Sequence, residues 1–451
     1  MSTIVITPKD RIPRSIASCN EIFVPADKSI FHRILMLAAL SESEVSILTI
    51  GKLSSDVQTT VDALVQLGVR IDQRGKEIIV YGVGKNGFKK TSEPINCRNS
   101  GTTARLLMGL LASQSFESTL IGDESLSKRP MARLAKILNE QLGADISCSD
   151  SETLPVQILG KELHSASVIL PVASAQIKSS ILLAAFCSNT AIKISEPEKS
   201  RDHTEKMMLS MGIDLQIDTT SVSIQANRSF QIPHTYSYQI SGDLSSAAFF
   251  AVAAAITKTD LTINNVGLNS TRSRFFEILT GAGVPVFYEE VAIANGELFG
   301  NVVIYGSKIS RVKPFTVGGE DIPNLQDEIP ALTVLALFAD GRSTIVGATE
   351  LRLKESDRIH AMADNLERIG GRVTELPDGL EITGSADFIP SGATINSYGD
   401  HRIAMAMAIV ALKSSGVVTI PNAEVVSISS PTFFELLGGI PAASMIAITE
   451  L

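Results

Sequence analysis

The chain repeats one pattern of secondary structure six times, and this repeat constrains the fold more than any single motif does. Each unit contains an apolar helix, a short strand, a polar turn, an amphipathic helix, a glycine and a further strand. The period of roughly 70 residues exceeds the period of about 20 to 50 residues in solenoid repeats, so six large blocks should build a closed or paired architecture. The glycines that we expect to end the amphipathic helices are Gly68, Gly143, Gly212, Gly283, Gly371 and Gly439.

The first helix of each unit is apolar on nearly every side, as in IFHRILMLAAL (30–40) and RIAMAMAIVAL (402–412). A helix of this kind belongs in the interior, whereas the amphipathic helices cover the outside. The pattern predicts an α/β fold with two domains of three units each. We expect domain 1 to comprise residues 1–24 and 243–451 and domain 2 residues 25–242, with a hinge near 24–25 and 241–243 that allows closure on a ligand.

Charge, cysteine content and hydropathy exclude several classes of protein. The net charge of −9 argues against a general nucleic-acid-binding surface. Residues 1–14 lack the apolar core of a signal peptide, and no apolar run is long enough to span a membrane. The sequence therefore predicts a soluble cytoplasmic monomer that binds neither membranes nor nucleic acid. Buried free thiols are expected at Cys19, Cys97, Cys148 and Cys187, whose spacing suits neither a metal site nor a disulfide scaffold.

Polar residues gather where the apolar helices begin. Any one of them could simply cap its helix, but their recurrence with Lys28, Arg33, Arg105, Lys178 and Arg402 favours an anion site at the helix N-termini. Two such faces across a hinge would enclose an anionic ligand. The polar groups are Asp27 to Ser29, Asn99 to Thr102, Ser174 to Gln176, Asp243 to Ser246, Asp327 with Glu328, and Asp400 to Arg402.

A second set of cations lies in the turns before the amphipathic helices. Equivalent positions of a repeat should lie on the same face, so these cations should join the first set. Arginine and lysine together suit small, highly anionic substrates. The second set is Arg129, Arg201, Arg272, Lys354 and Arg358.

Eight motifs in order carry a resemblance to a known family. They are ADKSIFHR (26–33), NSGTTAR (99–105), GDESLSKRP (122–130), SAQIKSS (174–180), SRDHTE (200–205), IPNLQDEIP (322–330), LRLKESDR (351–358) and YGDHRIAMA (398–406). Over nearly its whole length the chain resembles the 5-enolpyruvylshikimate-3-phosphate synthases. The resemblance implies a two-domain inside-out α/β barrel with buried parallel helices. It also implies transfer of the enolpyruvyl group of phosphoenolpyruvate to the 5-hydroxyl of shikimate 3-phosphate, with release of phosphate, on the shikimate pathway to chorismate and aromatic amino acids.

The resemblance further implies the roles of individual residues. Asp327 would be the base and Glu355 the proton donor, a role that Lys354 or Lys28 could share. Neither a metal nor a cofactor would be needed, because cations neutralise the leaving phosphate. The residues implied for shikimate 3-phosphate are Lys28, Ser29, Arg33, Ser174, Ala175, Gln176, Arg201, Asp327 and Lys354. Those implied for phosphoenolpyruvate are Lys28, Asn99, Gly101, Arg129, Gln176, Arg358 and Arg402.

Some positions depart from one branch of the family. Ala175 stands in place of a serine, Phe31 in place of a small polar residue, and Ile428 near a ligand lysine, so that lysine is not carried over. A second branch tolerates such changes. That branch can have alanine at the position of Gly101, which narrows the phosphoenolpyruvate site against the inhibitor glyphosate. Because Gly101 has no Cβ, we expect sensitivity to glyphosate.

Two alternatives from other classes stay open. A UDP-N-acetylglucosamine enolpyruvyl transferase usually carries a reactive cysteine in the loop that reads GDESLSKRP here, which leaves only Cys97 as a candidate thiol. A non-enzymatic six-unit ring protein, such as a DNA sliding clamp, would spread its cations along helices rather than cluster them at turns with Asp327 and Glu355. Of the histidines, His203 and His401 are expected to orient neighbouring groups, and His32 to lie in the core.

Overall fold

The structure is a computed structural model that describes residues 2–8, 20–226, 235–440 and 446–450. Within these ranges each predicted unit contains both of its helices. The first helices are α1 (Lys28–Ala39), α3 (Gly101–Leu111), α5 (Ala175–Ser188), α7 (Leu244–Thr257), α10 (Ile329–Leu337) and α12 (His401–Ala411). The second helices are α2 (Ser55–Gln66), α4 (Ala132–Leu142), α6 (His203–Ser210), α8 (Arg274–Gly281), α11 (Arg358–Arg368) and α13 (Phe433–Gly439). Shorter helical turns are η1 (Leu126–Lys128), η2 (Gly306–Lys308), η3 (Gly319–Asp321), α9 (Ile322–Leu325), η4 (Thr349–Leu353) and η5 (Ala423–Ile428).

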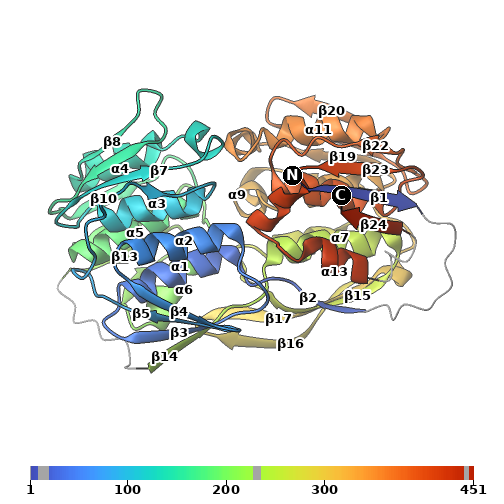
Figure 1. Cartoon of the computed structure of the whole chain (residues 1–451). Helices are drawn as coiled ribbons and strands as arrows, with labels where there is room; N and C mark the ends of the chain where they lie inside the picture. The colour runs from blue at the N-terminus through green and yellow to red at the C-terminus, as the bar shows by residue number, and fades with distance from the viewer. Residues whose placement is uncertain (1, 9–19, 227–234, 441–445, 451) are drawn as a thin grey trace.

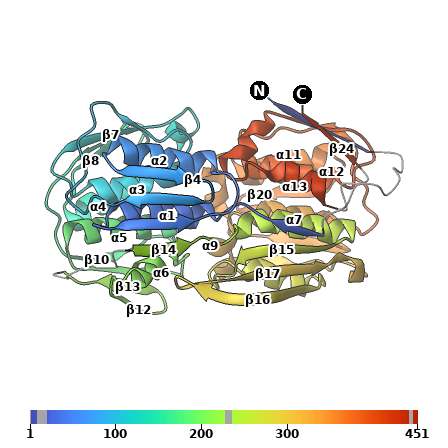
Figure 2. The same cartoon turned by 60° about the horizontal axis from the view of Figure 1, so that its bottom comes forward.

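These elements form two lobes that lie side by side, which we call the α1–α6 lobe and the α7–α13 lobe (Figures 1 and 2). Both labelled chain ends belong to the α7–α13 lobe. Each lobe has its own buried hydrophobic cluster: one runs from Ile30 to Ile240, and the other combines Ile4 to Val24 with Leu244 to Ile440. The α/β fold with buried first helices is confirmed, because nearly every residue of α7, α10 and α12 is buried.

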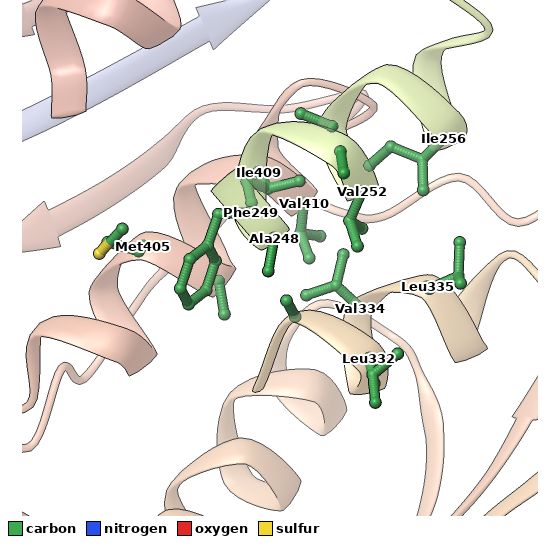
Figure 3. Close-up of a cluster of buried hydrophobic side chains, with 14 of the residues drawn as sticks. Ala248, Phe249, Val252, Ile256, Leu332, Val334, Leu335, Met405, Ile409 and Val410 are labelled. Carbon is green, nitrogen blue, oxygen red and sulfur yellow. The ribbon is translucent and has the colours of Figure 1, made fainter. Parts of the chain in front are cut away.

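The core of the α7–α13 lobe shows why these helices are apolar all round. Side chains of α7, α10 and α12 face one another, with Phe249, Val334 and Ile409 among those in Figure 3. The ring of Phe433 packs against Phe250 at a centroid distance of 5.3 Å and so ties α13 to α7. Burying one such aliphatic or aromatic side chain stabilises a fold by about 1.5–3 kcal/mol.

Six four-stranded sheets surround the helices, and all six share one pattern of a parallel pair followed by two antiparallel pairs. In the α1–α6 lobe the strand orders are β14 (Thr235–Gln239), β3 (Glu44–Leu48), β5 (Glu77–Tyr81), β4 (Arg70–Arg74); β6 (Ile95–Asn96), β7 (Glu117–Ile121), β9 (Val156–Leu159), β8 (Ile146–Cys148); and β10 (Ala166–Ile169), β11 (Ile192–Ser195), β13 (Ser221–Ile224), β12 (Leu215–Ile217). In the α7–α13 lobe they are β2 (Glu21–Phe23), β15 (Asp260–Gly267), β17 (Glu297–Tyr305), β16 (Val286–Ala294); β18 (Thr316–Val317), β19 (Gly341–Ile345), β21 (Gly379–Gly384), β20 (Arg372–Leu376); and β22 (Ala393–Thr394), β23 (Val418–Pro421), β1 (Thr3–Pro8), β24 (Ile446–Glu450). This repetition confirms the six-unit interpretation of the sequence.

The chain passes between the lobes twice, and the two passages are hydrogen-bonded to each other. The Asp27 N–H donates to the Ser241 carbonyl at 2.9 Å, and the Asp243 N–H donates to the Pro25 carbonyl at 2.8 Å. An antiparallel bridge pairs Ala26 with Gly242 between them. The starts of α1 and α7 are therefore fixed to one another where the chain passes between the lobes.

Most of the punctuating glycines behave as expected. Gly68, Gly143, Gly212 and Gly283 have φ between +76° and +92°, the left-handed conformation that ends a helix. The prediction is wrong for Gly371, because the preceding Gly370 takes this conformation with φ +86°. It is also wrong for Gly439, which is the last residue of α13 rather than the residue after it.

The thiols follow the expectation in part. Cys97 and Cys187 are buried, and burial raises the pKa of each to about 12, which makes Cys97 a poor nucleophile. Cys148 is free but partly exposed, contrary to the prediction, and Cys19 lies outside the described residues.

Within the described ranges, no helix is long and apolar enough to cross a bilayer.

Candidate active site

A polar cleft lies between the lobes, where the N-termini of the buried helices face the turns before α4, α6, α10 and α11. The residues implied for the two substrates and for proton transfer converge here: every one of them except Asn99 lines the cleft. The lining cations are Lys28, Arg33, Arg105, Arg129, Arg133, Arg201, Lys354, Arg358 and Arg402, and the lining carboxylates are Asp56, Asp243, Asp327, Glu350 and Glu355.

Helix capping explains why polar side chains gather at this place. Asp27 accepts the Ile30 N–H at 2.9 Å, and Ser100 accepts the Thr103 N–H at 3.2 Å, so each satisfies a backbone donor at the start of its helix. Ser174, Asp243 and Asp400 cap α5, α7 and α12 in the same way. The capping interpretation is therefore right for these residues. The residues that follow each cap are left to face the cleft.

On the α1–α6 side, Arg33 and Arg105 are held by neutral oxygen acceptors rather than by carboxylates. Arg33 donates from Nε to Thr204 Oγ1 at 3.0 Å and from Nη1 to the Ser29 carbonyl at 2.8 Å. Arg105 donates from Nη1 to Gln176 Oε1 at 3.0 Å. Burial, with a smaller contribution from a neighbouring arginine, lowers the pKa of Arg33 and of Arg105 to about 10 each. Both guanidiniums remain charged at neutral pH and have charge to offer an anion.

Asp327 lies among three arginines of the cleft. Its carboxylate oxygens are 2.8 Å from Arg201 Nη1, 3.2 Å from Arg358 Nη1 and 3.2 Å from Arg402 Nε. Burial alone would raise the pKa of Asp327, but these arginines outweigh it and hold the pKa well below its usual value. Asp327 is ionised in this state.

Glu355 has a similar environment. Arg358 Nη2 lies 2.7 Å from one of its oxygens, and Arg129 Nη1 of the opposite lobe lies 3.3 Å from the other. Burial is again outweighed by the arginines, so the pKa of Glu355 lies well below its usual value. Lys354 differs, because burial lowers the pKa of its ammonium to about 8.

The structure places two predicted cations outside the cleft. Arg272 does not line the cleft; it is 2% exposed and is surrounded by carboxylates. Lys178 is also buried, 2.6 Å from Glu196 and 2.7 Å from Glu205. The repeat predicted the backbone positions of Arg272 and Lys178 correctly. Their side chains pair with buried carboxylates instead of lining the cleft.

Asn99 stands directly behind the cleft lining. Its Oδ1 accepts from Arg129 Nη2 at 2.8 Å, and its Nδ2 donates to Asp123 at 2.9 Å. In this state Asn99 therefore orients Arg129, which does line the cleft.

Several cleft residues escaped the sequence interpretation. Asp56 lies 2.8 Å from Lys28 Nζ, while Ser54 caps α2. Arg133 and Glu350 form a pair at 3.2 Å across the two lobes. Arg133 follows Arg129 by four residues in KRPMAR, a spacing that could have suggested a shared face. No such signal marks Glu350.

The three histidines singled out in the sequence are all buried. His32 is buried, with Nδ1 2.7 Å from Thr60 Oγ1, as predicted for a core residue. His203 Nδ1 lies 2.7 Å from Glu297 of the other lobe. His401 is buried at the edge of the cleft, and burial together with Lys28 and Arg402 places its pKa well below the usual value, so it is neutral.

Comparison with known proteins agrees with this geometry. A family model described as EPSP synthase (3-phosphoshikimate 1-carboxyvinyltransferase) matches residues 17–437. The chain is 38% identical to the 3-phosphoshikimate 1-carboxyvinyltransferase of Geobacillus kaustophilus, over 94% of this chain and 98% of the relative. It is 41% identical to the protein of the same name from Limosilactobacillus fermentum, over 92% and 95% of the two chains.

A solved structure agrees as well. EPSP synthase from Acinetobacter baumannii superimposes with a TM-score of 0.84 at 37% identity and covers 100% of both chains. These matches favour neither the nucleotide-sugar transferase nor the ring protein that the sequence left open. The chain belongs to the EPSP synthase (3-phosphoshikimate 1-carboxyvinyltransferase) family.

Proposed function

We propose that the cleft between the lobes transfers the enolpyruvyl group of phosphoenolpyruvate to the 5-hydroxyl of shikimate 3-phosphate, with Asp327 and Glu355 moving the protons. The reaction releases phosphate and belongs to the shikimate pathway to aromatic amino acids. The observation that carries the residue assignment is the convergence of arginines from both lobes on these two carboxylates. Together the substrates bring about five to six negative charges, which suits the cation-rich lining.

Shikimate 3-phosphate binds mainly to the α1–α6 lobe in this proposal. Ser29, Arg33, Ser174, Ala175 and Gln176 lie at the starts of α1 and α5, where free N–H groups and the helix dipole favour a phosphate. The further contacts come from Lys28, Arg201, Asp327 and Lys354, which bring the 5-hydroxyl within reach of the base.

Phosphoenolpyruvate lies between the two lobes. Arg129 approaches from one lobe, and Arg358 and Arg402 approach from the other. Each of these arginines already pairs with a carboxylate of the cleft, and the carboxylate and phosphate of the substrate offer the same kind of anionic oxygen acceptor. Lys28, Gln176 and Gly101 complete the assignment, and Asn99 contributes by holding Arg129. The cations stabilise the negative charge of the departing phosphate.

The proton transfers follow from the bonds that change. The 5-hydroxyl oxygen forms a bond to the central carbon of phosphoenolpyruvate and loses its proton to Asp327, while the methylene carbon gains a proton from Glu355 to become a methyl group. The carbon–phosphate oxygen bond then breaks as the methyl group returns a proton to Glu355, which restores both the double bond and the proton donor. Bound anions draw the arginines away from Asp327 and Glu355, which raises the pKa of both carboxyls toward values useful for proton transfer. Lys354 or Lys28 can share the proton-donor role.

The test compares Asp327→Asn with the matched variant Asp321→Asn, in which an exposed ion pair to Arg274 is lost instead. Phosphate release from phosphoenolpyruvate is measured with shikimate 3-phosphate and, separately, with UDP-N-acetylglucosamine as acceptor. We expect release only with shikimate 3-phosphate, a kcat about 10²- to 10⁴-fold lower for Asp327→Asn, and a change within about twofold for Asp321→Asn. Release only with the nucleotide sugar, or an unchanged kcat in Asp327→Asn, contradicts the proposal.

We also propose that glyphosate inhibits this enzyme. A Cβ on Gly101 would lie 2.8 Å from Arg105 Nη1 and 3.3 Å from Arg129 Nη1, so the bare glycine leaves room beside Arg105 and beside Arg129, which we propose binds phosphoenolpyruvate. Micromolar glyphosate at low phosphoenolpyruvate should inhibit the native enzyme, and Gly101→Ala should weaken that inhibition. Full activity of the native enzyme under these conditions contradicts the proposal.

We propose further that the chain works as a cytoplasmic monomer of two domains, residues 1–24 with 243–451 and residues 25–242. The separate hydrophobic clusters support the division, and a cleft lined by one chain needs no second copy. Buried free thiols at Cys97 and Cys187 suit a reducing compartment. Light scattering should give the monomer mass of 48.1 kDa, and twice that mass would contradict the proposal.

A further inference from the structure

One buried guanidinium joins the two lobes beneath the cleft. Arg272, in the turn before α8, donates from Nη1 to Asp27 at the start of α1 in the opposite lobe. Its Nη2 donates to Ser245 Oγ at 2.6 Å and lies 3.3 Å from Asp243 and 3.4 Å from Glu328. Arg272 is 2% exposed, and its side chain does not line the cleft.

The carboxylates around Arg272 also define where helices begin. Asp27 caps α1, and Asp243 caps α7 through the Ser245 N–H at 2.8 Å. Glu328 directly precedes α10 and is fully buried. One side chain therefore connects the starts of α1, α7 and α10, at the point where the chain passes between the lobes.

Two of these carboxylates are sequence neighbours of proposed catalytic groups. Asp27 immediately precedes Lys28, and Glu328 immediately follows Asp327. Lys28 and Asp327 belong to opposite lobes, and both line the cleft. Whatever holds Asp27 at a fixed distance from Glu328 thus holds Lys28 at a fixed distance from Asp327.

Charge makes this arrangement depend on Arg272. Asp27, Asp243 and Glu328 are all buried, and buried acids need a compensating cation. Among the described cations Arg272 pairs with all three, whereas Arg201 reaches only Glu328, at 3.7 Å. Burial would raise the pKa of Asp27, but Arg272 and other neighbouring positive groups more than offset it and keep the pKa below its usual value. A lysine cannot replace this function fully, because a single ammonium lacks the planar fork that reaches several acceptors at once.

Comparison with Arg358 shows what is particular to Arg272. Arg358 occupies a corresponding place in its repeat and is held by the cap of α12, with Nε 2.8 Å from Asp400. Its other nitrogens reach Asp327 and Glu355 in the cleft. In Arg272 the corresponding nitrogens are occupied by Asp27, Ser245 and Glu328 instead.

We propose that Arg272 is a positioning residue, which sets the separation of Lys28 and Asp327 across the junction of the two lobes. It does not touch the substrates. This inference rests on the proposed roles of Lys28 and Asp327 in the transfer reaction.

The test measures kcat, both KM values and calorimetric binding of shikimate 3-phosphate for Arg272→Gln in the full chain. We expect kcat to fall about 100-fold, as for a displacement of catalytic groups by about 1 Å. Binding of shikimate 3-phosphate should change less than about threefold, because its proposed phosphate contacts lie within the α1–α6 lobe. The matched control is Arg274→Gln two residues along the chain, where an exposed arginine pairs with Asp321 and Glu277. Its kcat should stay within about twofold.

A second pair of variants separates positioning from a general loss of structure. Adding Asp27→Asn to Arg272→Gln removes one uncompensated charge while asparagine still caps α1, so kcat should recover at least about tenfold over Arg272→Gln. Arg272→Lys should lie about tenfold below the native kcat, and it can be measured even if Arg272→Gln does not fold. Native kcat in folded Arg272→Gln or Arg272→Lys, or a double variant no better than Arg272→Gln, overturns the proposal. A native enzyme without transfer activity would instead count against the proposed function.

Discussion

Lys354 differs from the other cations of the cleft because its charge can be lost near neutral pH. Burial, helped by the nearby Arg358 and opposed by Asp327, lowers the pKa of this ammonium from 10.5 to about 8. The cleft arginines do not share this property near neutral pH, because even Arg33 and Arg105, whose pKa burial lowers to about 10, stay charged there. A loss of activity near pH 8 should therefore report on Lys354.

We predict that kcat/KM for phosphoenolpyruvate falls as pH rises through about 8, because Lys354 is protonated below its pKa and neutral above it. In kcat the same fall should occur at higher pH, since bound substrate anions favour the charged ammonium. Initial rates between pH 6 and 10 measure both profiles. Lys354→Arg should remove the fall near pH 8, and an unchanged profile in that variant would assign it to another group.

Single residues were predictable where they follow the repeat and a helix start. Lys28, Arg129, Arg358 and Arg402 all line the cleft, as their positions in the repeat indicated. Arg272 shows the limit, because the direction of its side chain depends on Asp27 in the other lobe, 245 residues away in sequence. The repeat predicts where a backbone position lies, but not which acid will meet its side chain.

Among the elements, α3 and α5 make an unusually close contact that aligns two parts of the site. A Cβ on Gly109 would lie 2.0 Å from the Ser180 carbonyl oxygen, and Ser180 Oγ donates to the Arg105 carbonyl at 2.8 Å. At the N-terminal ends of the same helices, Gln176 Nε2 donates to Thr102 Oγ1 at 2.9 Å. Only glycine permits this separation of the helix axes.

We predict that Gly109→Ala pushes α3 away from α5 and lowers the free energy of unfolding by about 1–3 kcal/mol, as expected for overpacking. KM for shikimate 3-phosphate should rise, because the contact between Gln176 and Thr102 loosens. Denaturant titration and steady-state kinetics measure the two effects. Gly281→Ala is the control, since the space around its Cβ is open; it should leave both quantities nearly unchanged or add a few tenths of a kcal/mol. Equal stabilities of the two variants would contradict the prediction.

The helices and sheets were more predictable than the contacts between them. Periodicity alone separates the buried α10 from the amphipathic α11. Every residue of α10 is buried, whereas α11 buries only one face. The strand β14 illustrates what periodicity cannot supply, since it pairs with β3 about 190 residues earlier and completes the first sheet of its lobe. A pairing of this kind depends on the three-dimensional positions of the first and last strands of the lobe, which the repeat pattern does not give.

On the scale of the whole molecule, the lobes meet through the two chain passages and through ion pairs across the cleft. Arg201 lies 2.8 Å from Asp327, Arg129 lies 3.3 Å from Glu355, and the half-exposed pair of Arg133 and Glu350 is 3.2 Å apart. An exposed pair contributes only about 0–1 kcal/mol. The charges that line the cleft oppose these attractions. Nine cations but only five carboxylates line it, so the cleft carries a net positive charge when no ligand is bound. Repulsion between the cations of the two lobes favours an open arrangement of the free protein.

We therefore predict that shikimate 3-phosphate makes the protein more compact, because its phosphate and carboxylate bring about three negative charges into the cleft. Small-angle scattering should show a smaller radius of gyration at saturating ligand than without it. Shikimate without the phosphate is the matched control; it offers only its carboxylate and should leave the radius close to that of the free protein. High salt should reduce the difference, since screening weakens the repulsion that opens the free state. An identical radius with and without shikimate 3-phosphate would mean that the two lobes are already held together by Arg201, Arg129 and Arg272, and that binding requires no closure.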